Sequence, residues 1–205
     1  NTKARIWGNA DANEKIKIIA SWGEELNLTA DGQGKWAIEI QTPKGSHTPQ
    51  QLIIKGNNEI FLNNILIGEV WLCSGQSNMA WSVKNSNNAY DEIKKADYPS
   101  IRYFNVPRSM SWKPEDDVDA SWELCTPETT VDKSAIGYFF ARKLLNDLDV
   151  PIGLILSSWG GSGAQAWIDK ETTAKEGHQA IVDWYETHEQ KMKDQRFEWM
   201  KSTAV

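Results

Sequence analysis

The sequence predicts a protein of the α/β class in two parts: a small antiparallel β-sandwich-like domain over residues 1–66, then a parallel-sheet α/β core over residues 67–205. The first part is predicted from short runs in which polar and apolar residues alternate, the period of a half-buried strand. The second is predicted from almost wholly apolar runs separated by a helix-period pattern, which is typical of a parallel sheet. The length suits one good-sized domain, or a small domain joined to part of a second.

The strands expected in the first part are short and separated by clear turn signals. Lys15–Ala20 and Lys35–Ile40 both alternate between polar and apolar residues, and Gln51–Lys55 is a third strand. Glycine, proline and asparagine clusters mark where the chain turns. The clusters are Asp31–Gly34, Thr42–Ser46, Asn57–Asn58 and Asn63–Asn64.

Three apolar runs are the candidate strands of the parallel core: Glu69–Ser74, Ile101–Val106 and Ile152–Ser157. The first is nearly all apolar, so we expect it to be buried on both faces of the sheet. Asp132–Leu148 has apolar residues at spacings of three and four, which predicts a helix that Asp132 or Ser134 caps. Strand, helix and strand in this order predict a βαβ unit with a right-handed crossover. The tail from Glu171 to about Lys201 is predicted to be helical and charged.

Composition excludes some classes of partner. The formal net charge is −6, and nucleic-acid binding needs a basic face, so nucleic acid is not the expected partner. No apolar run approaches the ~20 residues of a membrane span, so no membrane partner is expected. The first ten residues have no apolar core of a signal peptide.

The cysteines and tryptophans have mainly structural interpretations. Cys73 and Cys125 are too few for a disulfide framework, and they form no Cys-x-x-Cys metal or redox pair. Cys73 is expected to be a small buried side chain, although a disulfide between the two cysteines stays open as an alternative. The 11 tryptophans offer flat faces that suit sugar rings, but Trp7, Trp22 and Trp36 lie in strand-like segments and are expected in the core or between strands.

The first candidate motif is Gly75–Met79, which follows the run Glu69–Ser74 directly. A serine at the carboxyl end of a central strand projects into the crevice where open α/β sheets bind ligands. A tight turn at Gly75 also leaves backbone N–H groups near the Ser77 hydroxyl, where they can stabilise an oxyanion. Taken alone, the same pattern also suits a serine that only caps a turn.

The second candidate motif is the glycine-rich segment Ser157–Gly163, which follows the run Ile152–Ser157. Its glycines suit an oxyanion-hole loop that faces Ser77 from a neighbouring strand. Gly161-x-Gly163-x-x-Ala166 also resembles a dinucleotide-binding turn, but the region ~20 residues further on lies in a predicted helix rather than at the end of a second strand. No Gly-Lys-Ser/Thr is present, which excludes a P-loop.

Together these blocks resemble the sialate O-acetylesterase family, a branch of the SGNH hydrolases. The matching stretches are GEVWLCSGQSNM followed by Trp81, IRYFNVP at Ile101–Pro107, SAIGYFFARKL at Ser134–Leu144 and VPIGLILSSWGGSGAQAWID at Val150–Asp169. The β-rich segment before them resembles that family's accessory domain. The resemblance therefore implies that residues 67–205 are the amino-terminal part of an SGNH/flavodoxin-like hydrolase core.

The resemblance implies a serine esterase that removes O-acetyl groups from sialic acid or another sugar through an acetyl-serine. Ser77 would be the nucleophile, and its own N–H with that of Gly160 or Gly161 would form part of the oxyanion hole. Gln76 and Asn78 would contact substrate or only hold the turn. Trp159 and Trp167 would border the sugar or pack in the core. The mechanism needs no metal and no cofactor.

The sequence departs from the family in what it lacks. Family members are considerably longer, with a later Gln-Gly-Glu block that completes the oxyanion hole and an Asp-x-x-His block that supplies the base and its acid. Neither block is present, and His47, His178 and His188 stand in no such setting. We therefore expect a remaining carboxy-terminal portion to carry the Asp/His pair, and these residues alone to hydrolyse acetyl esters very poorly.

Two rival functions remain open at this stage. A non-catalytic carbohydrate-binding fragment would account for the tryptophans, the β-rich part and the absent histidine block. A dinucleotide-dependent enzyme would need measurable NAD binding. The family's preference for O-acetylated glycans implies a periplasmic or extracellular location.

Overall fold

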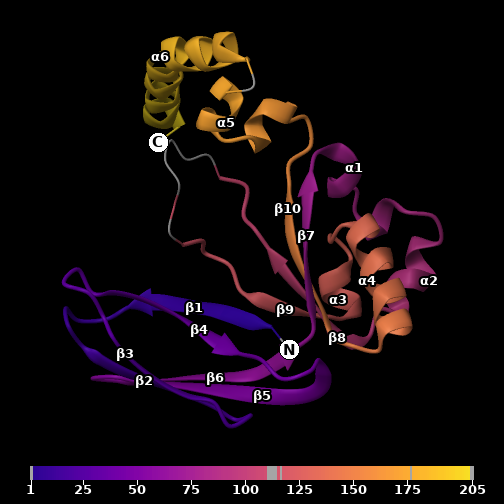
Figure 1. Cartoon of the computed structure of the whole chain (residues 1–205). Helices are drawn as coiled ribbons and strands as arrows, with labels where there is room; N and C mark the ends of the chain where they lie inside the picture. Colours follow the sequence, from indigo (N-terminus) through magenta and orange to yellow (C-terminus); the bar gives the residue numbers. More distant parts are fainter. Residues whose placement is uncertain (1, 110–114, 116, 176, 204–205) are drawn as a thin grey trace. The chain divides into compact units, whose positions relative to one another are not determined.

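The computed structural model describes residues 2–109, 115, 117–175 and 177–203. The chain forms two compact units, Asn1–Ser158 and Trp159–Val205. Among the described residues, all strands lie in the first unit, and the second consists of helices and the loops that join them (Figure 1). This is a mixed α/β architecture with antiparallel and mixed sheets. The predicted boundary at residue 67 falls where the chain passes from one sheet to another, inside the first unit.

The amino-terminal strands are all antiparallel, as the alternating runs predict. β1 (Lys3–Asn9) pairs with β4 (Lys35–Gln41), and a separate sheet has the strand order β3-β2-β5-β6. Its strands are β2 (Lys15–Ala20), β3 (Glu25–Thr29), β5 (Ser46–Lys55) and β6 (Glu59–Ile67). The inward residues of these strands form one core: Ile16, Ile18, Ala20, Ala30, Trp36, Ile40 and Leu52.

Three expectations for this region were wrong. Asn63–Asn64 does not end a strand but lies within β6, where Asn64 has a φ of 56° and the β5–β6 register is irregular. Trp7 is 65% exposed because it faces away from the core. Trp22 lies in a turn rather than a strand, but it is half-buried and packs against this core as expected, and its indole N–H donates to the Gln41 carbonyl at 2.9 Å. Trp36 is buried as predicted.

The second sheet has the strand order β7-β10-β8-β9. Its strands are β7 (Glu69–Gly75), β8 (Tyr98–Asn105), β9 (Trp122–Cys125) and β10 (Ile152–Ser158). β10 lies in the middle and is parallel to both neighbours, with Leu154 opposite Trp71 on one side and Tyr103 on the other. The three predicted core strands are therefore present and parallel. β9, which pairs antiparallel with β8, was not predicted.

Helices cover one face of this sheet (Figure 1). They are α1 (Ser77–Ala80), α2 (Ala89–Lys94), α3 (Pro127–Thr130) and α4 (Ala135–Leu148). α4 is the predicted helix. Ser134 caps it by accepting a hydrogen bond from the Gly137 amide at 3.1 Å, so the cap is Ser134 and not Asp132. α4 approaches β10 closely enough that a Cβ on Gly137 would lie 3.3 Å from Leu154 Cδ1.

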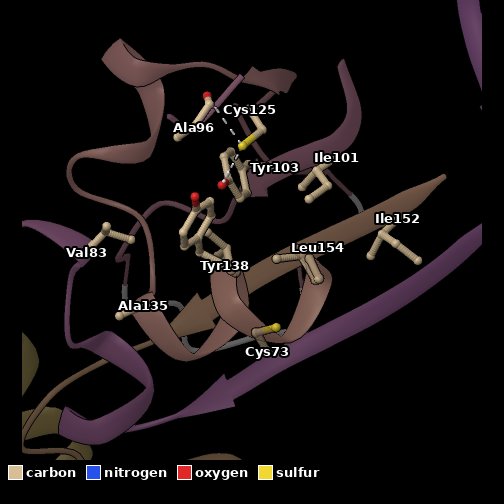
Figure 2. Packing of buried hydrophobic residues seen from close by; sticks show 12 residues of the cluster. Cys73, Val83, Ala96, Ile101, Tyr103, Cys125, Ala135, Tyr138, Ile152 and Leu154 are labelled. Atoms are coloured by element: carbon tan, nitrogen blue, oxygen red, sulfur yellow. Dashed lines mark hydrogen bonds between the residues drawn. The ribbon is translucent and has the colours of Figure 1, made fainter. Parts of the chain in front are cut away.

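Buried side chains from the sheet and α4 form the second core (Figure 2). The Tyr103 hydroxyl donates to Cys125 Sγ at 3.1 Å inside it. Cys73 and Cys125 are both buried free thiols, so the interpretation of Cys73 as a small buried side chain holds. Leu154, Ile152 and Ile101 are almost fully buried on the same face of the sheet.

The expectation that Glu69–Ser74 is buried on both faces was wrong. Trp71 and Cys73 point toward the helices, and Trp71 packs edge-on against Phe140 of α4 at 5.1 Å between ring centroids. Val70 and Leu72 point to the opposite face and are 60% and 66% exposed. This open face also carries Phe104, Trp122, Leu124 and Ile155. An apolar run therefore predicts that a strand forms, but it does not show whether other parts of the chain cover both faces of that strand.

The second unit contains η2 (Ala164–Trp167), α5 (Lys170–Lys175) and α6 (Gln179–Thr203). The predicted helical tail is therefore two helices, separated by a segment in which Gly177 has a φ of 78°. On α6, Ile181 and Trp184 are exposed, while the neighbouring Val182 is buried. No helix among the described residues has both the length and the apolar character to cross a membrane.

Burial on the two faces of the sheet predicts different costs for the same substitution. Leu154→Ala should lower the free energy of unfolding by about 2–5 kcal/mol, because it opens a cavity in a closed core. Leu72→Ala, on the adjacent strand but 66% exposed, should change it by less than about 0.5 kcal/mol. Urea denaturation of both variants tests this, and equal losses would show that the open face is covered in solution.

Candidate active site

Ser77 is positioned by the turn that joins β7 to α1. β7 ends at Gly75, whose φ of 128° is a conformation that residues with a side chain rarely adopt. Gln76 follows as the residue before the helix, and Ser77 is the first residue of α1. Ser77 is exposed at the carboxyl end of a parallel strand, where open α/β sheets form their ligand-binding crevice.

The end of β10 lies beside this turn. Ser158, the last residue of β10, is directly opposite Gly75 in the parallel register. The chain continues from Ser158 into Trp159, Gly160 and Gly161, which belong to the second unit. The contribution of Gly160 and Gly161 to an oxyanion hole, and that of Trp159 to a sugar site, therefore stay predictions.

The glycine-rich segment has its own local structure within the second unit. Gly161 has a φ of 81°, and both glycines are exposed. The Ser162 hydroxyl donates to the Trp159 carbonyl at 2.7 Å and accepts from the Trp167 indole at 2.8 Å. The segment leads into η2, a single short turn, and not into the long helix that a dinucleotide-binding turn requires. This geometry argues against the dinucleotide interpretation.

The side chains of Gln76 and Asn78 are exposed and make no hydrogen bond to another described residue. The turn is held by backbone groups instead: the Gln76 carbonyl accepts from Ala80 N at 2.9 Å, and the Asn78 carbonyl accepts from Trp81 N at 3.3 Å. Both side chains are therefore available to a ligand at the Ser77 site, although that role stays a prediction.

A cavity of about 300 Å³ lies against the other side of α1. Its lining residues are Met79, Ala80, Asn105, Val106, Arg108, Asp132, Ser134, Leu156 and Ser158. Arg108 Nε donates to the Ser158 carbonyl at 3.3 Å, and Asp132 forms an ion pair with Lys84 at 2.5 Å. The cavity thus offers one cation, one paired carboxylate, an amide and hydroxyls. This mixture suits a neutral, hydroxyl-rich ligand better than a strongly charged one.

The sequence analysis did not identify Asn105 and Arg108. A signal for Asn105 was present, because it lies near the carboxyl end of the predicted strand Ile101–Val106, at the same edge of the sheet as Ser77. Arg108 follows that strand in a loop whose path no local pattern predicts. Its place at the cavity is known from the structure alone.

Among the described residues of the first unit, the one histidine, His47, does not lie beside Ser77. No described residue forms a hydrogen bond with the Ser77 hydroxyl. His47 lies in β5, and its ring contacts Ser100 and Asp149. β10 extends from the level of Ile101 to the level of Gly75, about 20 Å at ~3.3 Å per residue, so His47 is too far from Ser77 to act on it.

Other potentially reactive side chains have partners or environments of their own. Cys73 lies two residues before Gly75, but burial raises the pKa of its thiol, so it stays protonated and is no rival nucleophile. His188, in the second unit, stacks on Trp184 with 4.5 Å between ring centroids. Across the described residues no group of three or more His, Cys, Asp or Glu side chains could hold a metal ion.

Comparison with known proteins gives one consistent result. Residues 67–196 match the family model described as carbohydrate esterase, sialic acid-specific acetylesterase. Human sialate O-acetylesterase is 39% identical over 182 residues, which is 80% of this chain and 35% of that protein. The mouse sialate O-acetylesterase is 31% identical over 187 residues, covering 82% of this chain and 35% of that protein.

A solved structure extends this likeness to the fold. The crystal structure of a carbohydrate acetylesterase from Xanthomonas citri superposes with a TM-score of 0.80 and 31% sequence identity. The match covers 85% of this chain and 40% of that one. The chain therefore spans about a third of the length of the sialate O-acetylesterases it matches.

The backbone at Gly75 predicts a cost for adding a single methyl group. Gly75→Ala should lower the free energy of unfolding by about 1–3 kcal/mol, because its φ of 128° disfavours any Cβ. Space is not the obstacle, since the added Cβ would have Met79 Cβ as its nearest neighbour at 3.9 Å. Gly32→Ala, at a glycine without positive φ and with nothing within 4 Å, is the matched control for urea denaturation. Equal stability of the two variants would contradict the strained turn.

Proposed function

This chain belongs to the family of sialic acid-specific carbohydrate acetylesterases, and we propose that it supplies the nucleophile half of an O-acetylesterase active site. The proposed substrate is an O-acetylated sugar or glycan, with sialic acid as one candidate. In the same proposal the β7-β10-β8 sheet is part of an SGNH/flavodoxin-like hydrolase core, and the antiparallel strands before it form a sandwich-like accessory domain.

The position of Ser77 is the observation that carries this proposal. It is an exposed serine at the carboxyl end of a parallel strand, after a glycine with positive φ, and level with the end of the neighbouring strand β10. The amides of the first helical turn have no acceptor within the helix. A hydroxyl and free amides at one strand end are what acyl transfer requires of a nucleophile and part of an oxyanion hole.

The proposed reaction follows the general scheme of serine hydrolysis. Ser77 Oγ attacks the acetyl carbonyl carbon, and its proton passes to a base. The Ser77 amide and an amide of Gly160 or Gly161 would hold the negative oxygen, after which the sugar hydroxyl leaves. Water then releases acetate from the acetyl-serine. The base and its acid would come from an Asp/His pair in a remaining carboxy-terminal portion.

Substrate contacts in this proposal come from groups around the serine. Gln76 and Asn78 have unbonded amides, and Trp159 is 38% exposed, so its ring face is open to a sugar. The neighbouring cavity adds Asn105 and Arg108.

Because O-acetylated glycans occur on cell surfaces and in secretions, the periplasmic or extracellular location is kept as part of the proposal.

A second candidate function is carbohydrate binding without catalysis. It is favoured by the unbonded Ser77 hydroxyl and by the exposed tryptophans Trp7, Trp81, Trp122, Trp159 and Trp184. The two functions differ in covalent chemistry. Labelling of Ser77 by a serine-directed phosphonate, in a longer polypeptide that contains this sequence and a downstream Asp-x-x-His, favours the enzyme. Sugar binding without labelling favours the binding module.

The proposed location of the base outside these 205 residues predicts weak activity for them alone. Their rate of acetate release from an O-acetylated sugar should lie at least about 10³-fold below that of such a longer polypeptide, because the loss of a triad member typically costs this much. Acetate release under saturating substrate measures both rates. Full-rate turnover by the 205 residues alone would contradict the proposal that the base lies outside them.

The identity of the nucleophile is tested by one substitution in the longer polypeptide. Ser77→Ala should abolish acetate release and leave the unfolding midpoint almost unchanged, because the hydroxyl is exposed and forms no bond to a described residue. Ser74→Ala, at another exposed serine of the same strand end, is the matched control and should retain activity. Activity retained in Ser77→Ala would place the nucleophile elsewhere.

A further inference from the structure

A serine, a histidine and an aspartate form a hydrogen-bonded chain at the opposite end of the sheet from Ser77. His47 Nδ1 lies 2.7 Å from Ser100 Oγ. His47 Nε2 lies 3.3 Å from Asp149 Oδ1 and 3.2 Å from the Asp149 carbonyl oxygen. The three residues are brought together from β5, from β8 and from the residue that ends α4.

The partners define the direction of the hydrogen bonds. Both oxygens of Asp149 near the ring can only accept, so His47 Nε2 carries the proton and donates to them. In the neutral ring Nδ1 is then unprotonated, and it accepts a hydrogen bond from the Ser100 hydroxyl. The hydrogen bonds therefore run in the same direction as in a Ser-His-Asp triad, from the serine to the histidine and from the histidine to the aspartate. The two ring nitrogens are exchanged, because here the serine bonds Nδ1 and the aspartate bonds Nε2.

Several features of the fold hold this arrangement. Asp149 has φ 52° and ψ 44°, the left-handed conformation that a non-glycine residue adopts at a cost, and it presents its carbonyl and its carboxylate to one ring. Two residues before His47, the chain packs tightly against the end of α4: a Cβ on Gly45 would lie 3.1 Å from Val150 Cγ1. The His47 ring itself is held between the Ser100 hydroxyl and Asp149.

The three residues also face a common space. A cavity of about 380 Å³ is lined by His47, Ser100 and Asp149 together with Tyr98, Pro99, Leu145, Asn146 and Asp97. Tyr98, Pro99 and Leu145 offer apolar surface to a small acyl or aryl group. The Asn146 amide, which lines the same cavity, is a donor for a developing negative charge. An acyl group therefore has room beside the Ser100 hydroxyl.

We propose that Ser100 is a second nucleophilic serine, activated by His47, that reacts with small activated acyl esters and serine-directed phosphonates. His47 acts as the general base, and Asp149 is a positioning residue that holds the ring in the reactive tautomer. The proposal does not rest on the function proposed for Ser77, because Ser100 lies near the start of β8 and Ser77 lies beyond the end of β7, at the opposite edge of the parallel sheet.

The chemical step is an ordinary acyl transfer. Ser100 Oγ forms a bond to the carbonyl carbon of a phenyl ester while its proton passes to His47 Nδ1. The bond from that carbon to the phenolate oxygen breaks, and the phenol leaves with the proton that His47 returns. Water then attacks the acyl-serine with the same base and releases the carboxylic acid. Asp149 is 96% exposed, so water screens its carboxylate, and the step should be slower than in a closed triad.

The test is labelling of the 205-residue protein with a fluorophosphonate, followed by tryptic digestion and mass spectrometry. Ser77 and Ser100 fall in separate peptides, Gly56–Lys84 and Ala96–Arg102, so each serine is read independently. We expect label on Ser100, and we expect His47→Gln to slow it at least about tenfold. His188→Gln, a histidine that contacts no serine, is the matched control and should leave the rate unchanged.

Two further variants separate reactivity from structure. Asp149→Asn retains a residue that tolerates the left-handed conformation, so it should slow Ser100 labelling without shifting the unfolding midpoint. Ser100→Cys retains His47 and should react with iodoacetamide at least about tenfold faster than Ser74→Cys, an exposed position with no histidine. This second comparison holds even if removal of His47 impairs folding.

The outcomes are distinct. Label on Ser100 that depends on His47 supports the proposal, whatever happens at Ser77. No label on Ser100, or label that His47→Gln leaves unchanged, overturns it. Equal alkylation of the two cysteine variants also overturns it. Failure of Ser77 to label in a longer polypeptide would count against the esterase proposal alone.

Discussion

The parallel pairing of β10 between β7 and β8 is the constraint on which the rest of the first unit depends. Its register places Ser158 opposite Gly75, so the last residues of β10 and β7 lie at the same edge of the sheet. Leu154 and Leu156, on one face of the same strand, give α4 its packing surface. The buried centre and the candidate site therefore have a common origin, because a strand that slipped by two residues would separate Ser158 from Gly75 and misplace the leucines.

The sequence predicted much of this arrangement because the relevant signals are local. The core strands were expected within a few residues of their bounds, and α4 was expected from its apolar spacing, with Ser134 as one of two candidate caps. The antiparallel character of the first strands followed from alternation. Ser77 was identified as a candidate because it follows a glycine turn at the carboxyl end of a predicted strand, where open α/β sheets bind ligands. Its catalytic role stays a prediction, as do those of Gly160 and Gly161.

What the sequence could not predict depends on contacts between distant residues. His47 is 53 positions from Ser100 and 102 positions from Asp149, so no spacing rule connects them. Contacts between distant residues also decide which face of a strand is buried, so the wrong expectation for Trp7 has the same cause: its strand is amphipathic, but its ring lies on the exposed face. β7 shows a related failure, because composition alone does not say whether a second layer covers the strand. Asn63–Asn64 was misjudged because asparagine also tolerates the left-handed residue of an irregular strand.

The open face and outer edge of β7 have a consequence for how the molecules behave in bulk solution. A strand edge with exposed Val70 and Leu72 is a template on which another copy could add a strand, and shape offers little obstacle to such growth. Repulsion between like charges is the main opposing force, and the formal net charge is −6. Because ions screen this repulsion over about 8 Å at 0.15 M ionic strength, association of copies through this edge should increase with salt concentration.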